Sequence, residues 1–213
     1  MKITILGAGG SIGKRILNEA ARRNHEISLI TSKPVSYFEL ADAEKVNTHS
    51  ADIFDTDTLS NLFKGNDVVI SAYAPPADNH DILLEASRSL VEACKNADVR
   101  LIAVGGAGSL KVTENTQLID TPDFPEEYRS IAAAHRKALE SVYYHETTLN
   151  WTNVSPSAYI FEGERTNQFR IGEDNLLLNE KGESAISMED FAVGILNEVE
   201  DAKFVKKRFT IGY

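Results

Sequence analysis

Short apolar runs alternate along the chain with longer segments in which apolar residues recur every three or four positions. The short runs predict buried strands, and the longer spacing predicts amphipathic helices. Strands are predicted at residues 2–6, 28–30, 46–49, 67–71, 100–104, 151–154 and 208–213. Helices are predicted at residues 11–23, 58–63, 81–97, 126–145 and 188–199. This alternation predicts an α/β, Rossmann-type, doubly wound parallel sheet that is covered by helices on both faces.

The regular alternation ends after Pro156. Residues 156–187 instead contain two short polar–apolar alternations around a turn at residues 173–175. Ser187, followed by Asp190, then resembles a capping box that starts the last helix. We therefore predict one domain over residues 1–213, in which residues 156–187 form most of a small C-terminal lobe on the substrate side.

Composition excludes several classes of protein. Cys94 is the single cysteine, so no disulfide is expected, and it lies in the apolar stripe of helix 81–97. No apolar run approaches the length of a membrane span, which favours a cytoplasmic protein with no membrane partner. The chain has 22 Lys and Arg against 32 Asp and Glu, a formal net charge of −10, which argues against a nucleic-acid partner. The basic stretch 203–208 is expected to be a solvated loop, and the histidines show no metal-ligand spacing.

A glycine-rich loop joins the first strand to the first helix. Glycine allows such a loop to turn tightly and to approach a pyrophosphate, which then meets the N-terminus of the helix. The loop fits two glycine spacings, 7–9–13 and 7–10–13. The predicted dinucleotide-binding residues here are Gly7, Gly9, Gly10, Ser11, Ile12 and Gly13. The alternative is a glycine turn that serves only helix–strand packing.

The end of the second strand predicts which nicotinamide cofactor is bound. Sites that prefer NAD usually carry an acid there, which binds the ribose 2′-hydroxyl. This chain has Thr31, Ser32 and Lys33 instead, a set that suits a 2′-phosphate. NADP(H) is therefore favoured over NAD(H), with a solvent-facing Lys33 as the alternative.

Further cofactor contacts are predicted after the other strands, because ligands of such sheets lie beyond the carboxyl ends of the strands. Asp52 and Ile53 are placed to touch the adenine. The residues expected to flank the rest of the cofactor are Ser71, Ala72, Tyr73, Val104, Gly105 and Gly106.

The chain resembles the atypical short-chain dehydrogenase/reductase superfamily. The resemblance is carried by the glycine loop and by segments 69–73, 104–109, 149–156 and 186–192. It is nearest to the small NmrA-like and NADH-flavin reductase-like members, which include biliverdin reductase B-type proteins. The resemblance implies an NAD(P)-binding oxidoreductase and places Pro156 at the cofactor.

The catalytic pair that is usual in this superfamily, Tyr-x-x-x-Lys on the helix after the fifth strand, is absent. The residue four before Lys137 is Ala133, and the residue four after Tyr128 is Ala132. Ordinary carbonyl reduction needs that proton donor. Flavins and quinones accept hydride readily and can be protonated from water, so they need mainly to be oriented against the cofactor.

Two functions follow from this combination. The first is hydride transfer from NADPH to a flavin (FMN or FAD), a quinone or a similar planar acceptor. Tyr73, Tyr159 and Phe161 are candidate walls for the acceptor, and Ser109 is a candidate hydrogen-bond donor, although all four could be packing or turn residues. The second is an NmrA-like sensor of the NADP(H) redox state that acts through a protein partner. Either form could be a monomer or a homodimer.

Overall fold

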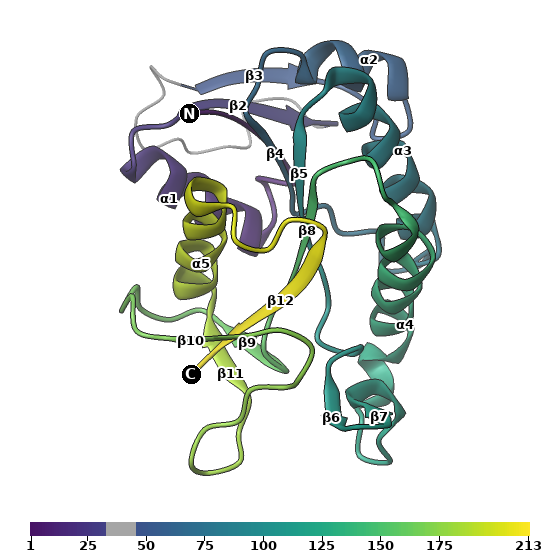
Figure 1. Ribbon diagram of the computed structural model, residues 1–213, viewed down its shortest axis with the longest axis vertical. Coiled ribbons are helices and arrows are strands. Elements are labelled where there is room, and N and C mark those ends of the chain that lie inside the picture. Colours follow the sequence, from purple (N-terminus) through teal and green to yellow (C-terminus); the bar gives the residue numbers. More distant parts are fainter. Residues whose placement is uncertain (33–45) are drawn as a thin grey trace.

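The computed structural model describes residues 1–32 and 46–213, and its centre is an eight-stranded sheet (Figure 1). Neighbouring strands run parallel except at one edge, where β10 is antiparallel to β12. In spatial order the strands are β10 (Arg170–Gly172), β12 (Lys207–Gly212), β8 (Trp151–Ser155), β5 (Arg100–Val104), β4 (Val68–Ser71), β1 (Lys2–Leu6), β2 (Glu26–Thr31) and β3 (Val46–Ser50).

Helices cover both faces of the sheet (Figure 1). One face carries α1 (Ser11–Arg22) and α5 (Met188–Asp201), and the other carries α2 (Thr56–Phe63), α3 (Ile82–Ala97) and α4 (Glu126–Ser141). Two short 3-10 helices, η3 (Leu118–Asp120) and η4 (Tyr143–His145), flank α4. None of the helices in the described ranges is long and apolar enough to cross a membrane.

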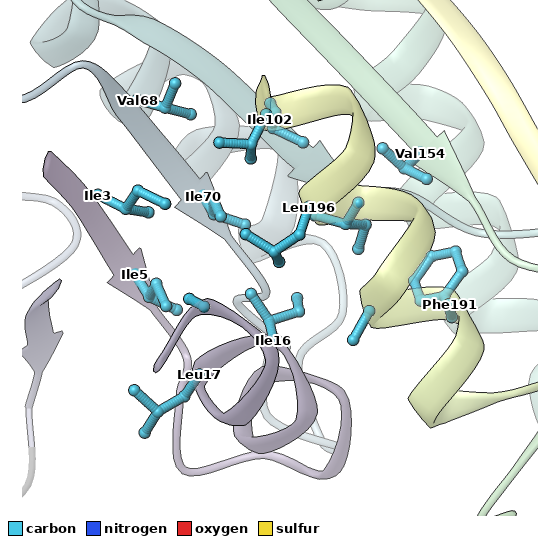
Figure 2. Close-up of a cluster of buried hydrophobic side chains, with 14 of the residues drawn as sticks. Ile3, Ile5, Ile16, Leu17, Val68, Ile70, Ile102, Val154, Phe191 and Leu196 are labelled. Carbon is cyan, nitrogen blue, oxygen red and sulfur yellow. The ribbon is translucent and has the colours of Figure 1, made fainter. Parts of the chain in front are cut away.

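Each face of the sheet has its own apolar core. Figure 2 shows the first, in which the strand residues Ile5 and Ile70 lie beside Ile16 of α1 and Leu196 of α5. The second lies under α2, α3 and α4 and includes Cys94, which is fully buried, so that desolvation raises the pKa of its thiol. Because both faces are covered, the central strands are apolar almost throughout, which is why their short runs were readable in the sequence.

The described structure confirms the predicted order of strands and helices in the main sheet, and it differs from the prediction at several points. The fourth long helix ends at Ser141 rather than at residue 145, and η4 follows it. The edge strand β10 was not predicted, because it is short and its strand pairing is with β12, which is distant in the sequence. Arg208 is buried rather than solvated, since Asp174 forms an ion pair with it at 2.6 Å.

Residues 156–187 form the region that we call the substrate-side lobe. Within it, β9 (Tyr159–Phe161) pairs in parallel with β11 (Ala185–Ser187), while β10 extends the main sheet. A small hairpin of β6 (Lys111–Thr113) and β7 (Thr116–Gln117) lies beside the start of α4 (Figure 1). The predicted cap is confirmed, because the Ser187 hydroxyl accepts a hydrogen bond from the Asp190 N–H at 3.0 Å.

Candidate functional site

The glycine loop is a tight turn that leaves no room for side chains at two positions. Gly7 has a φ of +79°, and a Cβ there would lie 2.4 Å from the Ala72 carbonyl oxygen. A Cβ on Gly13 would lie 2.1 Å from the Gly7 carbonyl oxygen. The loop therefore rests directly on the end of β4, and α1 packs against the loop through Gly13, as close approach requires.

The start of α1 has the properties of an anion site. Gly10 is the N-cap residue and provides no side-chain hydrogen bond to the first turn, which also contains no acid. Gly9, Gly10 and Ser11 are exposed. The first backbone N–H groups of α1 consequently remain available, and the helix dipole favours a negative group beside them. These features fit the pyrophosphate of a dinucleotide.

Several predicted cofactor residues lie together at the carboxyl edge of the sheet. Tyr73 follows β4 and is partly buried, and both desolvation and the nearby Asp52 raise the pKa of its phenol. Asp52 is exposed, and its side chain accepts a hydrogen bond from the Phe54 N–H at 3.0 Å. Asp52, which follows β3, and Tyr73, which follows β4, therefore lie close enough to interact electrostatically.

The other predicted cofactor residues follow neighbouring strands. Ser71 ends β4, Val104 ends β5, and Pro156 follows β8 as a buried residue. Thr31 ends β2 and Ser32 is exposed just after it, whereas Lys33 lies outside the described residues. The parallel pairing of these strands places their ends in one row, which leads from the glycine loop toward the substrate-side lobe.

His135 is a neighbour of this row that the sequence did not single out. It lines a cavity of about 10 Å³ together with Ser71, Tyr73 and Asn153, which is room for one water molecule. Desolvation, with a contribution from His80, lowers the pKa of His135 to about 4, so the imidazole is neutral at pH 7. The Asn153 side-chain oxygen is buried and has no partner among the described residues. No sequence motif marked His135 or Asn153 as site residues; only their positions on α4 and β8 place them near the row of strand ends.

The candidate acceptor walls lie in the lobe. Tyr159 and Phe161 are two residues apart in β9 and so lie on the same face of the strand. Their rings stack with centroids 5.4 Å apart and planes inclined by 15°. Phe161 in turn packs on Tyr213, with centroids 6.4 Å apart. Tyr159 is 65% exposed, so its outer face is open to a ligand.

Ser109 has a different place from the one predicted. Its side chain is buried, and its hydroxyl accepts a hydrogen bond from Arg208 at 3.1 Å. Because Ser109 is buried, its hydroxyl cannot contact a bound acceptor in this conformation. Lys137, by contrast, is exposed on α4.

Comparison with known proteins shows which family shares these features. The chain is 36% identical to YwnB of Bacillus subtilis, a protein described as uncharacterised, over 99% of this chain and 98% of YwnB. A solved protein of Burkholderia pseudomallei, proposed to be exported, is 37% identical over the full length of both chains, with a TM-score of 0.91. Another, from Streptococcus pneumoniae and proposed to be an NADH-flavin reductase, is 31% identical over 100% of this chain and 99% of that chain, with a TM-score of 0.89.

The family profile matches one continuous stretch that makes up most of the chain. It covers residues 7–202, from the first glycine of the loop to the end of α5. With the glycine loop, the uncapped start of α1 and the row of strand ends, this match leads to one assignment: the chain belongs to the NAD(P)H-binding family of Rossmann-fold proteins.

Proposed function

We propose that this protein is an NAD(P)H-dependent reductase, with NADPH favoured, that reduces a flavin, a quinone or a similar planar acceptor. The observation that carries the proposal is the exposed Tyr159–Phe161 stack, whose next residue, Glu162, forms an ion pair at 2.8 Å with Arg15 of α1, the helix that follows the glycine loop. The chain also lacks Tyr-x-x-x-Lys. The resemblance to a protein proposed to be an NADH-flavin reductase supports the same class of acceptor.

The protein's own part in this reaction is binding and orientation. The glycine loop and the start of α1 would hold the pyrophosphate, Thr31 and Ser32 lie where a ribose 2′-phosphate is expected, and the ends of β4 and β5 would flank the nicotinamide. The bound cofactor supplies a hydride, that is, two electrons and one proton. The acceptor takes up this hydride and one further proton from water, leaving oxidised NADP⁺.

The absence of the tyrosine–lysine pair favours flavins and quinones over ketones as acceptors. A ketone must gain a proton on its oxygen as hydride arrives. His135 of α4 does not replace the missing pair as an acid, because its pKa is lowered to about 4 and it carries no imidazolium proton near pH 7. A flavin or quinone spreads the negative charge over its rings, so water can protonate it afterwards. The chain is therefore suited to planar acceptors rather than to simple carbonyl compounds.

The direct test is loss of NADPH absorbance by the purified protein, with and without FMN, FAD, riboflavin or menadione, and with NADH in parallel. We expect acceptor-dependent oxidation above the uncatalysed rate, with higher kcat/KM for NADPH than for NADH. Absence of turnover with every acceptor would contradict the reductase proposal.

Two glycine variants test whether the loop binds the cofactor. In Gly13→Ala the new methyl group would meet the Gly7 carbonyl oxygen, so NADPH should bind at least about tenfold more weakly. Gly65→Ala is the control for general destabilisation, because its φ of +77° strains an alanine while nothing lies within 4 Å of the added Cβ. An unchanged Kd in Gly13→Ala, with the fold retained by circular dichroism, would argue against this binding site.

The missing tyrosine–lysine pair also supports a second function, a sensor of the NADP(H) redox state. A ligand shifts a conformational equilibrium only through different affinities for its states. A sensor should therefore bind NADPH and NADP⁺ with clearly different Kd values and show no turnover. Equal Kd values for NADPH and NADP⁺ would exclude the sensor function.

A further inference from the structure

Three buried polar side chains without a hydrogen-bond partner lie on one face of β8 and β12. They are Asn153, through its side-chain oxygen, and the hydroxyl groups of Ser155 and Thr210. Asn153 and Ser155 are two positions apart in β8, and Ser155 is the register partner of Thr210, so the three share the face whose core also contains Trp151. Native proteins pair nearly all buried polar atoms, either with protein groups or with ordered water. Such atoms therefore mark places where a water or a ligand is expected to bind.

Asn153 also lines the cavity of about 10 Å³ at the ends of β4, β5 and β8. This volume holds one water molecule, provided that at least two polar groups bind it. Ser71 and His135 line the same cavity, and the Ser71 hydroxyl, which accepts a hydrogen bond from the Tyr73 N–H at 3.4 Å, still has its own proton to donate. A water here would meet an acceptor on Asn153 and a donor on Ser71.

The other polar groups that line the cavity are uncharged. Desolvation, more than the nearby His80, lowers the pKa of His135 to about 4, so near pH 7 one ring nitrogen carries a proton and the other accepts a hydrogen bond. Ser87 and Tyr143 line the cavity as well. The Ser87 hydroxyl donates to the Leu83 carbonyl at 2.8 Å, and burial raises the pKa of the Tyr143 phenol to about 12. Neutral polar groups of this kind suit a water molecule rather than an ion.

Asn153 and His135 also lie directly against the segment that follows β5. A Cβ added to Gly105 would lie 2.3 Å from the Asn153 side-chain oxygen, and one added to Gly106 would lie 2.9 Å from the His135 Cβ. The Gly105 N–H donates to the Val154 carbonyl at 2.9 Å, which ties the same segment to β8. The segment that is expected to flank the nicotinamide is therefore in contact with two of the side chains that line the cavity.

We propose that Asn153 and His135 bind one buried water molecule and that Asn153, through this water and through its contact with Gly105, is a positioning residue for the nicotinamide. The inference rests on the proposed function and names residues that set the geometry of hydride transfer at the same site. A water that joins β8 to α4 fixes Asn153, which in turn fixes Gly105 beside the cofactor. Because hydride transfer depends steeply on the placement of donor and acceptor, loss of the water should slow the transfer more than it weakens cofactor binding.

The water site is tested by a high-resolution crystal structure of the full chain. We expect a water within about 3.2 Å of the Asn153 side-chain oxygen and of a polar atom of His135 or Ser71. In Asn153→Leu, which has a similar volume but no polar side-chain atom, this water should be lost. A wild-type cavity that holds no water would overturn the inference.

The positioning role is tested by single-turnover kinetics with NADPH and whichever of FMN, riboflavin or menadione the wild type reduces fastest. We expect Asn153→Leu to slow hydride transfer about tenfold and to leave Kd for NADPH within about twofold, because the pyrophosphate binds at the glycine loop. Thr210→Val is the matched control, since it removes a buried unpartnered hydroxyl from the same face outside the residues that line the cavity. An unchanged rate in Asn153→Leu would overturn the positioning role.

His135 provides a second test that does not depend on the folding of the Asn153 variant. His135→Gln keeps a neutral hydrogen-bonding side chain and should retain the rate to within about threefold, whereas His135→Leu should lower it about tenfold. Equal losses in the two variants would overturn the role of the water. Failure of the proposed function is distinct, because the wild type would then reduce no acceptor, and the crystal structure would still decide whether the water is bound.

Discussion

The helix-covered sheet and the substrate-side lobe are stabilised by different kinds of contact. In the sheet, large apolar side chains such as Ile70 and Leu101 are fully buried between helices. Residues 162–168 of the lobe instead depend on polar contacts: Arg165 bonds to Glu19 of α1 at 2.8 Å, and the Asn167 N–H bonds to Asp190 of α5 at 2.7 Å. Residues 162–168 are otherwise exposed.

This difference in contacts predicts that the lobe opens locally more readily than the sheet. Apolar packing is lost only when helices and strands separate, so the sheet should unfold as one cooperative unit. A segment held by a few hydrogen bonds can open locally at a lower free energy. We therefore expect the lobe to open while the sheet and the glycine loop stay folded, which would admit an acceptor without releasing the cofactor.

The largest effect should come from the sheet. Ile70→Ala removes a fully buried side chain from the core shown in Figure 2 and leaves a cavity, which should lower the free energy of unfolding by about 2–5 kcal/mol. Urea titrations followed by tryptophan fluorescence and by circular dichroism should shift together. Separate shifts of the two signals would contradict a single cooperative sheet.

Asp190→Ala should mainly loosen the lobe. The substitution leaves the Thr166 hydroxyl, the Asn167 N–H and the Tyr213 hydroxyl without their carboxylate, at a cost of about 2–4 kcal/mol. Limited trypsin digestion should cut at Arg165 much faster than in the wild type, before any global unfolding. Equal digestion rates would show that the lobe does not depend on this carboxylate. Asp201→Ala, an exposed change at the end of the same helix, is the control.

Glu146, which lies just before β8 in the chain, should make the stability of the fold depend on pH. Burial alone would raise its pKa, but hydrogen bonds from the Thr148 hydroxyl and from the Leu149 and Thr148 N–H groups outweigh this and lower the pKa to about 2. Since this lies below the ordinary value of 4.5, the carboxylate stabilises the fold above pH 4.5, and that stabilisation is lost as the pH falls through about 2.

In Glu146→Gln, the loss of stability between pH 5 and pH 2 should be smaller than in the wild type by roughly 2–3 kcal/mol. Urea midpoints measured across this range would show it. Parallel curves for the two proteins would mean that Glu146 is not the group responsible.

The smallest effect should come from a single ion pair of the lobe. Arg165→Met removes one partner of Glu19, which keeps its second partner Arg23 at 2.8 Å. Because Arg165 is partly exposed, we expect a loss of at most about 1 kcal/mol in unfolding free energy. Glu19→Gln, which removes the carboxylate shared by Arg23 and Arg165, should cost more, and the reverse order would contradict the role assigned to the buried Glu19.

Much of the fold could be predicted from patterns of residues that are close together in the sequence. The alternation of apolar runs and helical spacing predicted the order of the elements, and the glycine spacing predicted the tight loop on β4. The Ser187 cap was visible because a cap depends on residues three positions apart. In each of these cases the interaction is between chain neighbours, or the burial acts on a whole element.

Parts of the site could not be read in this way. Arg208 belongs to a basic stretch in the sequence, yet it is buried, because Asp174 and Ser109 reach it from distant segments. The packing of Phe161 on Tyr213, and the neutral state of His135, likewise depend on contacts between elements that are distant in the sequence.

The sequence by itself therefore determined the Rossmann-type framework and the dinucleotide loop, since both follow from periodicity and from the steric demands of glycine within a short segment. Only the tertiary structure decided which aromatic rings face each other and which charged groups lose their access to water. Those properties arise from side chains that are far apart along the chain, and their energies depend on distance and burial, which no local pattern encodes.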